Sequence, residues 1–174
     1  MSTFSQELPR RAVVIFLIHE DEVLLTKKLS KIGQGLWNGY GGKIEPGETD
    51  LECALRELSE ESGIVLAASD LEEMGHIDCR TYIDLEGTSL QSSMIVTLFI
   101  AKLSRRPRAR ASAETGEPQW FPVTELPYRE MIPTDLDWMP DIFAGRKIYA
   151  SIHLGPGQRT RVSPTAIVPL EQPE

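Results

Sequence analysis

Three glutamates stand close together in the segment from Gly41 to Ile64. Glu57, Glu60 and Glu61 are spaced i, i+3 and i+4, which places them side by side on one helix surface. Like charges at this spacing repel each other, so an isolated helix gains nothing from them. A cation among them would remove the repulsion, and carboxylate oxygens suit Mg²⁺ or Mn²⁺, with Mg²⁺ commonly acting together with substrate phosphates. The spacing therefore indicates metal-assisted chemistry on a phosphorylated substrate.

The helix that must position these carboxylates has recognisable ends. Thr49 or Asp50 can cap its first turn, and Gly63 can end it in a left-handed conformation. Arg56 precedes Glu60 by four residues and can pair with its carboxylate. A core-facing stripe follows the i, i+3, i+4, i+7 pattern: Leu51, Ala54, Leu55 and Leu58. On these observations alone, a solvated acidic surface helix remains the alternative.

The same segment resembles the motif of the Nudix hydrolases, GX5EX7REUXEEXGU, in which U is a bulky apolar residue. Every fixed position is filled, by Gly42, Glu48, Arg56, Glu57, Leu58, Glu60, Glu61, Gly63 and Ile64. A motif with so many fixed positions is highly specific. The resemblance implies an α/β fold, a Nudix-type α/β/α sandwich with a mixed β-sheet. It also implies metal-dependent cleavage of a nucleoside diphosphate linked to another group.

The resemblance further implies a set of metal ligands and a cofactor. Mg²⁺ is the expected ion, with Mn²⁺ as the alternative. One more acidic ligand is expected from the loop before the stretch EPQWF, with Glu114 as the first candidate and Glu117 as the second. The other ligands would be the backbone carbonyl of Gly41 and the carboxylates of Glu57, Glu60 and Glu61.

The implied catalytic residues are Arg56, Glu57, Glu60 and Glu61. Arg56 and Glu48 would anchor the loop and orient the carboxylates. Either Glu60 or Glu61 would help to deprotonate the attacking water, and the choice between them stays open. Metal ions neutralise phosphate oxygens and lower the pKa of bound water, so chelation of the metal should lower activity.

Three stretches outside the motif resemble the Nudix subgroup that hydrolyses oxidised purine nucleoside triphosphates. They are VLLTKKLSKIGQGLWNGYGGK, EPQWFPVTELPYREMIP and DLDWMP. In that subgroup an asparagine after a tryptophan and an acidic residue near a late helix contact the base, and Asn38 and Asp135 occupy those places. The chain departs from the pattern at Ile132, where the subgroup's animal members have tryptophan, and at Thr134, which replaces an acidic residue. The resemblance therefore favours nucleotide-pool sanitation, including 8-oxo-dGTP hydrolysis to the monophosphate and pyrophosphate.

Further substrate contacts are expected from residues near these stretches. Lys28 could hold phosphates or the base, while Met94 and Trp138 could form apolar walls. For Met94 and Trp138, simple core packing is the alternative. For Asn38, the alternative is that its side chain satisfies a turn.

Composition limits the remaining possibilities. The 174 residues suit one domain, residues 1–174, and the net charge of −8 argues against a nucleic-acid binder, which would present a basic face. Two cysteines argue against a disulfide framework, and no apolar signal or membrane-spanning run is present, so the expected location is the cytoplasm. The expected partner is a small nucleotide, and the sequence leaves monomer and homodimer open.

Hydrophobic patterning and turn residues predict the other elements. A helix is expected at 135–144, and a glycine-containing loop at 32–36 that leads into WNGYGGK. Residues 1–9 and 171–174 are expected to fray. Strands are expected at residues 12–18, 23–28, 71–82, 91–103, 119–123, 147–154 and 159–168.

Three other functions remain open from the sequence. Another Nudix substrate, such as ADP-ribose, a dinucleoside polyphosphate or capped RNA, would use the same metal chemistry. A non-catalytic nucleotide sensor would not need a water-activating carboxylate cluster. Isomerisation of an isoprenoid diphosphate lacks an obvious Cys/Glu pair in a matching context.

Overall fold

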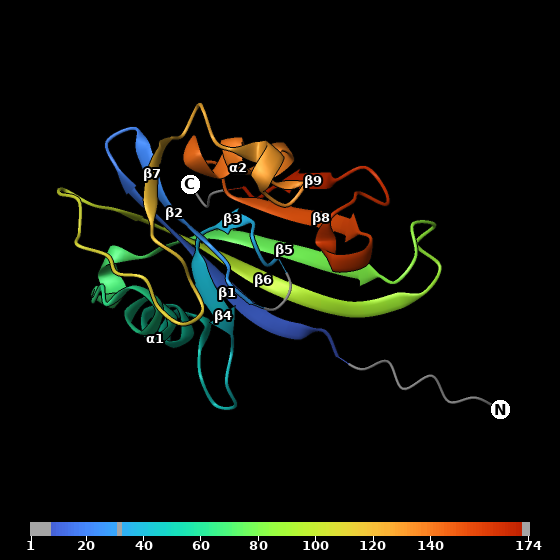
Figure 1. Ribbon diagram of the computed structural model, residues 1–174, viewed down its shortest axis with the longest axis horizontal. Coiled ribbons are helices and arrows are strands. Elements are labelled where there is room, and N and C mark those ends of the chain that lie inside the picture. Colours follow the sequence, from blue (N-terminus) through green and yellow to red (C-terminus); the bar gives the residue numbers. More distant parts are fainter. Residues whose placement is uncertain (1–7, 31–32, 172–174) are drawn as a thin grey trace.

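One mixed β-sheet forms the centre of the computed structural model, which describes residues 8–30 and 33–171. Within these residues the sheet has nine strands in the order β3-β2-β1-β6-β5-β8-β9, with β4 paired to β1 and β7 paired to β2 (Figure 1). The β1–β6 and β5–β8 pairs are parallel, and the β1–β2 and β5–β6 pairs are antiparallel. The strands are β1 (Arg10–His19), β2 (Glu22–Lys27), β3 (Trp37–Asn38), β4 (Tyr40–Lys43), β5 (Glu72–Tyr82), β6 (Leu90–Lys102), β7 (Gln119–Pro122), β8 (Ile148–Leu154) and β9 (Ala166–Pro169).

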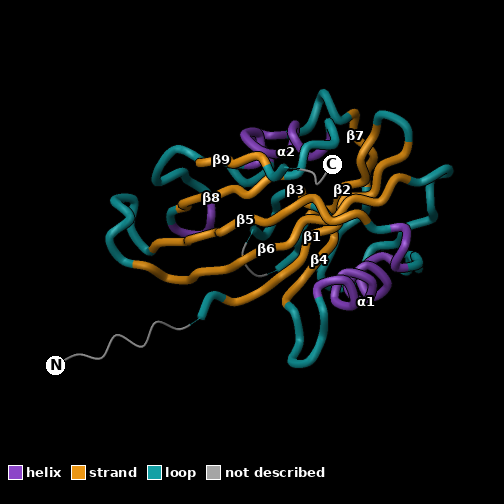
Figure 2. The backbone as a smooth tube through the Cα atoms, turned by 180° about the vertical axis from the view of Figure 1, so that it is seen from behind, coloured by secondary structure: helices purple, strands orange, loops and turns teal. Residues whose placement is uncertain are grey.

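Two α-helices cover opposite faces of this sheet. Helix α1 (Asp50–Ser62) packs on one face and α2 (Asp135–Phe143) on the other, and each helix has its own hydrophobic cluster (Figures 1 and 2). Short 3-10 helices lie at η1 (Ala68–Asp70), η2 (Tyr128–Glu130) and η3 (Pro156–Gln158). The predicted α/β/α sandwich with a mixed sheet is confirmed. None of the helices in the described part of the chain is both long and apolar enough to cross a membrane.

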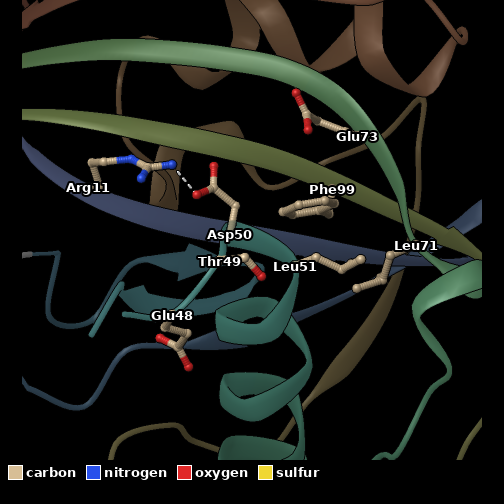
Figure 3. A pocket seen from close by; sticks show the side chains of 8 residues that line it. All are labelled: Arg11, Glu48, Thr49, Asp50, Leu51, Leu71, Glu73 and Phe99. Carbon is tan, nitrogen blue, oxygen red and sulfur yellow. Dashed lines mark hydrogen bonds and ion pairs between the residues drawn. The ribbon is translucent and has the colours of Figure 1, made fainter. Parts of the chain in front are cut away.

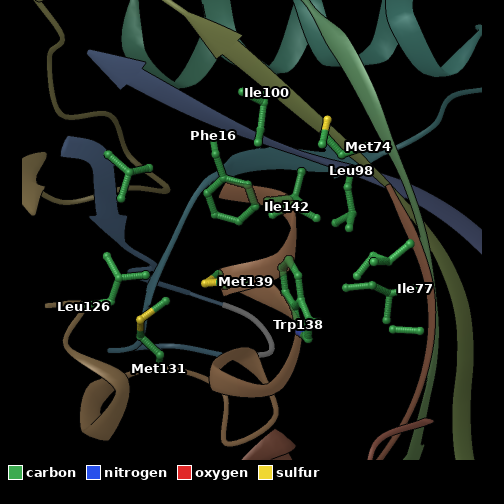
Figure 4. Close-up of a cluster of buried hydrophobic side chains, with 14 of the residues drawn as sticks. Phe16, Met74, Ile77, Leu98, Ile100, Leu126, Met131, Trp138, Met139 and Ile142 are labelled. Atoms are coloured by element: carbon green, nitrogen blue, oxygen red, sulfur yellow. The ribbon is translucent and has the colours of Figure 1, made fainter. Parts of the chain in front are cut away.

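Strand β1 lies between the two hydrophobic clusters, and residues 12–18 are all buried. A strand covered on both faces needs apolar side chains on both, which explains the unbroken run AVVIFLI. Its alternate residues belong to different clusters, with Phe16 on the α2 side and Ile15 on the α1 side. Figure 4 shows Trp138, Met139 and Ile142 of α2 directed towards Phe16 and the neighbouring strands.

One edge of β1 is shared by two partner strands. The end of β1 pairs with β2, while residues 12–15 pair with β4. Only glycine fits at Gly41, because a Cβ atom there would lie 2.0 Å from the carbonyl oxygen of Val13. This close approach brings β4 against α1.

The predicted α1 helix is confirmed at both ends. Thr49 caps it by accepting from the backbone N–H of Glu52, and the Glu52 carboxylate accepts from the N–H of Thr49. Gly63 ends the helix with φ of 75°, a left-handed conformation that residues with a Cβ atom disfavour. Of the predicted core stripe, Ala54 and Leu58 are buried, whereas Leu51 and Leu55 are only half-buried.

The loop expected at 32–36 is confirmed for residues 33–36, which form a turn and one irregular residue before β3. The sequence predicts no strand within WNGYGGK, whereas the chain forms β3 and β4 there, paired with β2 and β1. The strand expected at 159–168 is wrong at its start, since β9 is only Ala166–Pro169. In the part of the segment before β9, the side chains of Arg161 and Thr165 bind Asp137 of α2.

The other predicted strands and the predicted α2 helix are confirmed within a few residues of their expected ends. The fraying expected for residues 1–9 and 171–174 concerns mostly residues 1–7 and 172–174, which lie outside the described part, as does residue 32 of the expected loop.

Candidate active site

Arg56 links three of the motif's carboxylates. Its guanidinium donates to Glu48 through Nε (2.7 Å) and Nη2 (3.0 Å), and Nη1 lies 2.8 Å from Glu57 Oε1 and 3.3 Å from Glu60 Oε2. The hydrogen bonds from Arg56 are the main reason that the pKa of Glu48 falls to about 2. Glu48 therefore stays ionised, and this ion-pair network fixes the loop before α1 to the helix.

Glu61 lies in the interior beside this network. It is only 6% exposed, and the backbone N–H of Gly41 donates to its Oε2 (3.2 Å). Burial raises the pKa of Glu61 to about 7; Gly41 and Lys28 oppose the rise, while the charges of Glu57 and Glu114 add to it. A carboxyl group with this pKa can accept a proton near neutral pH.

The other two glutamates of the predicted carboxylate cluster, Glu57 and Glu60, differ in their surroundings. Glu57 lies against β4, where a Cβ atom at position 42 would be 2.3 Å from its Oε1, so Gly42 makes room for this carboxylate. The side chain of Glu60 is 62% exposed and contacts Arg56. Glu57 and Glu61 therefore face the β4 side, and Glu60 lies towards solvent.

The loop before β7 approaches the same end of α1. The Thr115 hydroxyl donates to the carbonyl of Glu61 (3.4 Å), and the carbonyl of Glu114 accepts from the N–H of Leu29 (2.9 Å). Lys28 forms an isolated β-bridge with Thr115, which holds it beside this loop. The structure thus brings Gly41, Lys28, Glu57, Glu61 and Glu114 together, although they are far apart in the chain.

The donor set suits a divalent cation. Five carboxylates (Glu48, Glu57, Glu60, Glu61 and Glu114) surround two cationic side chains, Arg56 and Lys28, so negative charge is in excess. Oxygen donors of this kind are those that Mg²⁺ and Mn²⁺ prefer. The oxygens are distributed along the helix, and in the described residues no three Asp, Glu, His or Cys side chains meet in an arrangement that would hold an ion.

Tyr40 is a site residue that the sequence did not indicate. It is fully buried, and its hydroxyl has no hydrogen-bond partner in the described part of the chain. Burial raises its pKa, and the charges of Glu61 and of Glu117 raise it further. Glu117, the second candidate for an acidic ligand, therefore also lies near this centre. The only sequence signal was the tyrosine's place between Gly39 and Gly41, just before the first glycine of the motif.

Asp135 and Trp138 lie at the start of α2, on the opposite face of the sheet. Each is 3% exposed, and neither Asp135 Oδ2 nor Trp138 Nε1 has a hydrogen-bond partner among the described residues. Burial raises the pKa of Asp135 to about 8, so this carboxyl is mostly protonated at neutral pH and can donate a hydrogen bond. Trp138 belongs to the α2-side core and its ring centroid is 6.1 Å from that of Phe16, as core packing requires.

Met94 shares this face of the sheet with Asp135. It is half-buried on β6 and lies directly opposite Cys79 of β5. After burial, the charge of Asp135 is the largest of the causes that raise the pKa of the Cys79 thiol, to about 12, which shows that these two groups are close. Asn38 instead accepts from the N–H of Gly39 (2.8 Å), the turn-type contact that the sequence left open.

A pocket of about 530 Å³ lies at the other end of α1 (Figure 3). Arg11 forms an ion pair with Asp50 there, and the Thr97 hydroxyl donates to the same carboxylate (2.6 Å). Since Asp50 begins the helix and Glu61 lies in its last turn, this pocket is remote from the buried carboxylate. Its paired charges tie the start of α1 to the sheet.

The NUDIX domain model matches residues 8–142. The chain belongs to the Nudix family. This Nudix hydrolase is 33% identical over 138 residues to the oxidized purine nucleoside triphosphate hydrolase of Mus musculus, covering 79% of this chain and 82% of the mouse protein.

A second relative and a solved structure are also similar to this chain. The oxidized purine nucleoside triphosphate hydrolase of Danio rerio is 31% identical over 127 residues, covering 73% of this chain and 75% of the fish protein. The crystal structure of a MutT protein from Bacillus halodurans has a TM-score of 0.71 at 23% identity, covering 91% of this chain and 97% of the other. The latter similarity shows that the fold is shared.

Proposed function

We propose that this Nudix hydrolase converts oxidised purine nucleoside triphosphates, such as 8-oxo-dGTP, to the monophosphate and pyrophosphate. The observation that carries the proposal is the excess of carboxylates around Glu61, on a chain whose relatives in mouse and zebrafish are named for this substrate class. A polyphosphate is itself anionic, so such a site can accept it only when cations are bound as well.

The carboxylates of Glu57, Glu60, Glu61 and Glu114 and the carbonyl of Gly41 would hold Mg²⁺ or Mn²⁺. Bound there, the ion supplies charge neutralisation for the phosphate chain and a lower pKa for the attacking water. Arg56 keeps Glu57 and Glu60 oriented through its hydrogen bonds of 2.8 and 3.3 Å.

Glu61 is the group that we assign as general base. Without a bound cation, burial raises the pKa of Glu61 to about 7; a cation beside it would favour the ionised form, which can take a proton from water. Glu60, the other candidate, is exposed and paired with Arg56, so it is less suited to this role. Lys28 lies close enough to influence Glu61 and can contact a phosphate oxygen.

Base recognition is assigned to the α2 side of the sheet. Asp135, buried and mostly protonated, would donate to the purine edge, Met94 would contact a face of the base, and Trp138, packed in the core, would form the apolar wall behind them. Asn38 would contact the base with its amide nitrogen, since its Oδ1 accepts from Gly39.

Product analysis tests this function. The purified protein with Mg²⁺ is given oxidised and normal purine triphosphates, pyrimidine triphosphates, ADP-ribose and a dinucleoside polyphosphate. We expect monophosphate and pyrophosphate, with the oxidised purines hydrolysed fastest, and loss of activity in excess EDTA. Full activity in EDTA would exclude the metal-dependent mechanism, and faster cleavage of ADP-ribose would identify another Nudix substrate.

Four points stay predictions from the sequence. They are the cytoplasmic location, the single domain of residues 1–174, the lack of stable nucleic-acid binding, and an assembly that is either a monomer or a homodimer.

A further inference from the structure

The 3-10 turn after β8 places a glutamine side chain on the sheet. Gln158 Nε2 donates to the hydroxyl of Thr81 (3.1 Å) and contacts the Sγ atom of Cys79 (3.6 Å). The backbone of Gln158 has φ of 60°, directly after Gly157 at 62°. Non-glycine residues rarely adopt this conformation, and where they do, the surrounding structure commonly holds a side chain for a function.

The face that Gln158 contacts is the one that carries the proposed base site. Cys79 is opposite Met94 in the β5–β6 pair, so the two side chains point to the same side of the sheet. Cys79 belongs to the α2-side cluster, and Thr81, two residues further along β5, shares its orientation. Asp135 is close enough to Cys79 to affect its ionisation. Gln158, Met94 and Asp135 therefore surround one region.

The segment 156–165 is attached to both sides of this region. Arg161 binds the carboxylate of Asp137 and the carbonyl of Pro133 (2.7 Å), which fixes the segment to the start of α2. The Thr165 hydroxyl donates to the same Asp137 carboxylate (2.6 Å). Arg159 donates to the carbonyl of Gln34, in the loop that leads into β3. Gln158 is thus held between the elements that carry Asp135 and Asn38.

The amide of Gln158 has one polar atom left for a ligand. Its nitrogen is used by Thr81 and Cys79, and its Oε1 accepts no hydrogen bond from the residues that the structure describes. An amide anchored through its nitrogen presents a fixed acceptor. The edge of a purine carries N–H groups, which need such an acceptor, and atoms that accept hydrogen bonds. Asp135 in its protonated form would supply the donor for those accepting atoms.

We propose that Gln158 is a specificity-determining residue of the base site, which accepts a hydrogen bond from an N–H group of the purine through Oε1. The inference rests on the proposed function and deepens it, because it adds a contact from the segment after β8. Thr81 acts through Gln158 as a positioning residue, since its hydroxyl holds the amide nitrogen.

Two substitutions separate the hydrogen bond from the backbone conformation. Gln158→Met keeps the length of the side chain without the amide, and Gln158→Gly relieves the left-handed backbone while it removes the side chain. For both variants we expect kcat/KM for the preferred purine triphosphate to fall about tenfold or more, as when a polar partner is left unpaired. Pyrimidine triphosphates should be hydrolysed at a nearly unchanged rate, so the ranking of bases changes.

A matched control and a second position complete the experiment. Gln91→Met makes the same substitution at an exposed glutamine of β6 and should leave the ranking of bases as in the wild type. Thr81→Val removes the anchor and should shift the ranking in the same direction as Gln158→Met, with a smaller effect. Thermal unfolding of each variant separates a loss of folding from a loss of discrimination.

The possible results are distinct. If the wild type ranks the bases and Gln158→Met ranks them identically, the inference is overturned while the proposed function stands. A change in Gln158→Gly without one in Gln158→Met would show that bulk matters rather than the hydrogen bond, which also overturns it. If the wild type hydrolyses no nucleoside triphosphate, both proposals fail.

Discussion

Glu61 and Asp135 are carboxyl groups that the fold removes almost completely from water. Burial raises the pKa of Glu61 to about 7 and that of Asp135 to about 8, yet the two lie on opposite faces of the sheet. Glu61 is surrounded by other carboxylates and by Lys28. These surroundings suit a proton acceptor that would lie beside bound metal ions. Asp135 lies against apolar side chains and keeps its proton, as a hydrogen-bond donor requires. Under the proposed function, the same chemical group would thus have two different roles, because its surroundings differ.

Glu61→Gln tests the assignment of the general base. The amide has the same shape but cannot take a proton, so we expect kcat to fall by about 10²–10⁴-fold, the usual contribution of general-base catalysis. Glu60→Gln serves as the comparison and should cost less, because Glu60 is exposed. Thermal unfolding in EDTA should show that both variants remain folded. Wild-type turnover in both would show that the catalytic centre lies elsewhere.

At the scale of elements, the contact between β4 and α1 builds the catalytic side of the molecule. The shared edge of β1 carries β4 against the helix, and Gly42 leaves the space that the Glu57 carboxylate occupies. Arg56 then connects this helix to Glu48 in the preceding loop. The orientation of the carboxylates therefore depends on backbone packing as well as on helix periodicity.

Alanine at two neighbouring glycines separates these effects. In Gly42→Ala the new Cβ meets the mobile end of Glu57, so we expect turnover to fall at least tenfold with little change in melting temperature. In Gly41→Ala the Cβ meets the backbone of Val13, so the melting temperature should fall by about 2 °C or more. Gly116→Ala, with its nearest neighbour at 3.6 Å, is the control and should change neither. Equal turnover in Gly42→Ala and wild type would contradict the packing argument.

At the scale of the whole molecule, one sheet separates two hydrophobic clusters, and under the proposed function each would serve a different part of the reaction. The α1-side cluster supports the carboxylates, and the α2-side cluster surrounds Asp135 and Trp138. Burying a carboxyl group in the second cluster costs stability whenever the group must ionise. Folding stability should therefore depend on pH through Asp135.

The unfolded chain loses the Asp135 proton near its ordinary pKa of 3.8, whereas the folded protein keeps it up to about pH 8. The stabilising contribution is complete below the lower value and is lost as pH rises to the higher one. Against Asp135→Asn, which does not titrate, the wild type should lose about 2 °C or more of melting temperature between pH 5 and pH 8 in EDTA. Parallel pH profiles would show that Asp135 titrates normally.

The family, the fold class and the helix that carries the carboxylates could all be predicted from the sequence. The family and the fold class come from the resemblance to the Nudix motif, whereas the helix follows from local rules, since caps, a periodic apolar stripe and i, i+3, i+4 spacing act within a few residues of one another. The strands β3 and β4 in WNGYGGK could not be predicted, because glycine-rich strands lack an alternating apolar pattern. The strand expected at 159–168 forms only from Ala166 onwards; before it, backbone pairing with β8 is limited to an isolated bridge between Leu154 and Arg161, and the side chains of Arg161 and Thr165 bind Asp137 of α2.

Only the tertiary structure decided which charged groups are buried and which distant residues meet. The motif treats Glu57, Glu60 and Glu61 alike, but packing against β4 buries Glu61 and leaves Glu60 in solvent. Helix periodicity cannot decide this, because exposure is set by what packs against the helix. Gln158 gave no signal in the sequence for the same reason, since its contact with Thr81 joins residues 77 positions apart. Such contacts arise from chain topology, so they become visible only once the strands are placed.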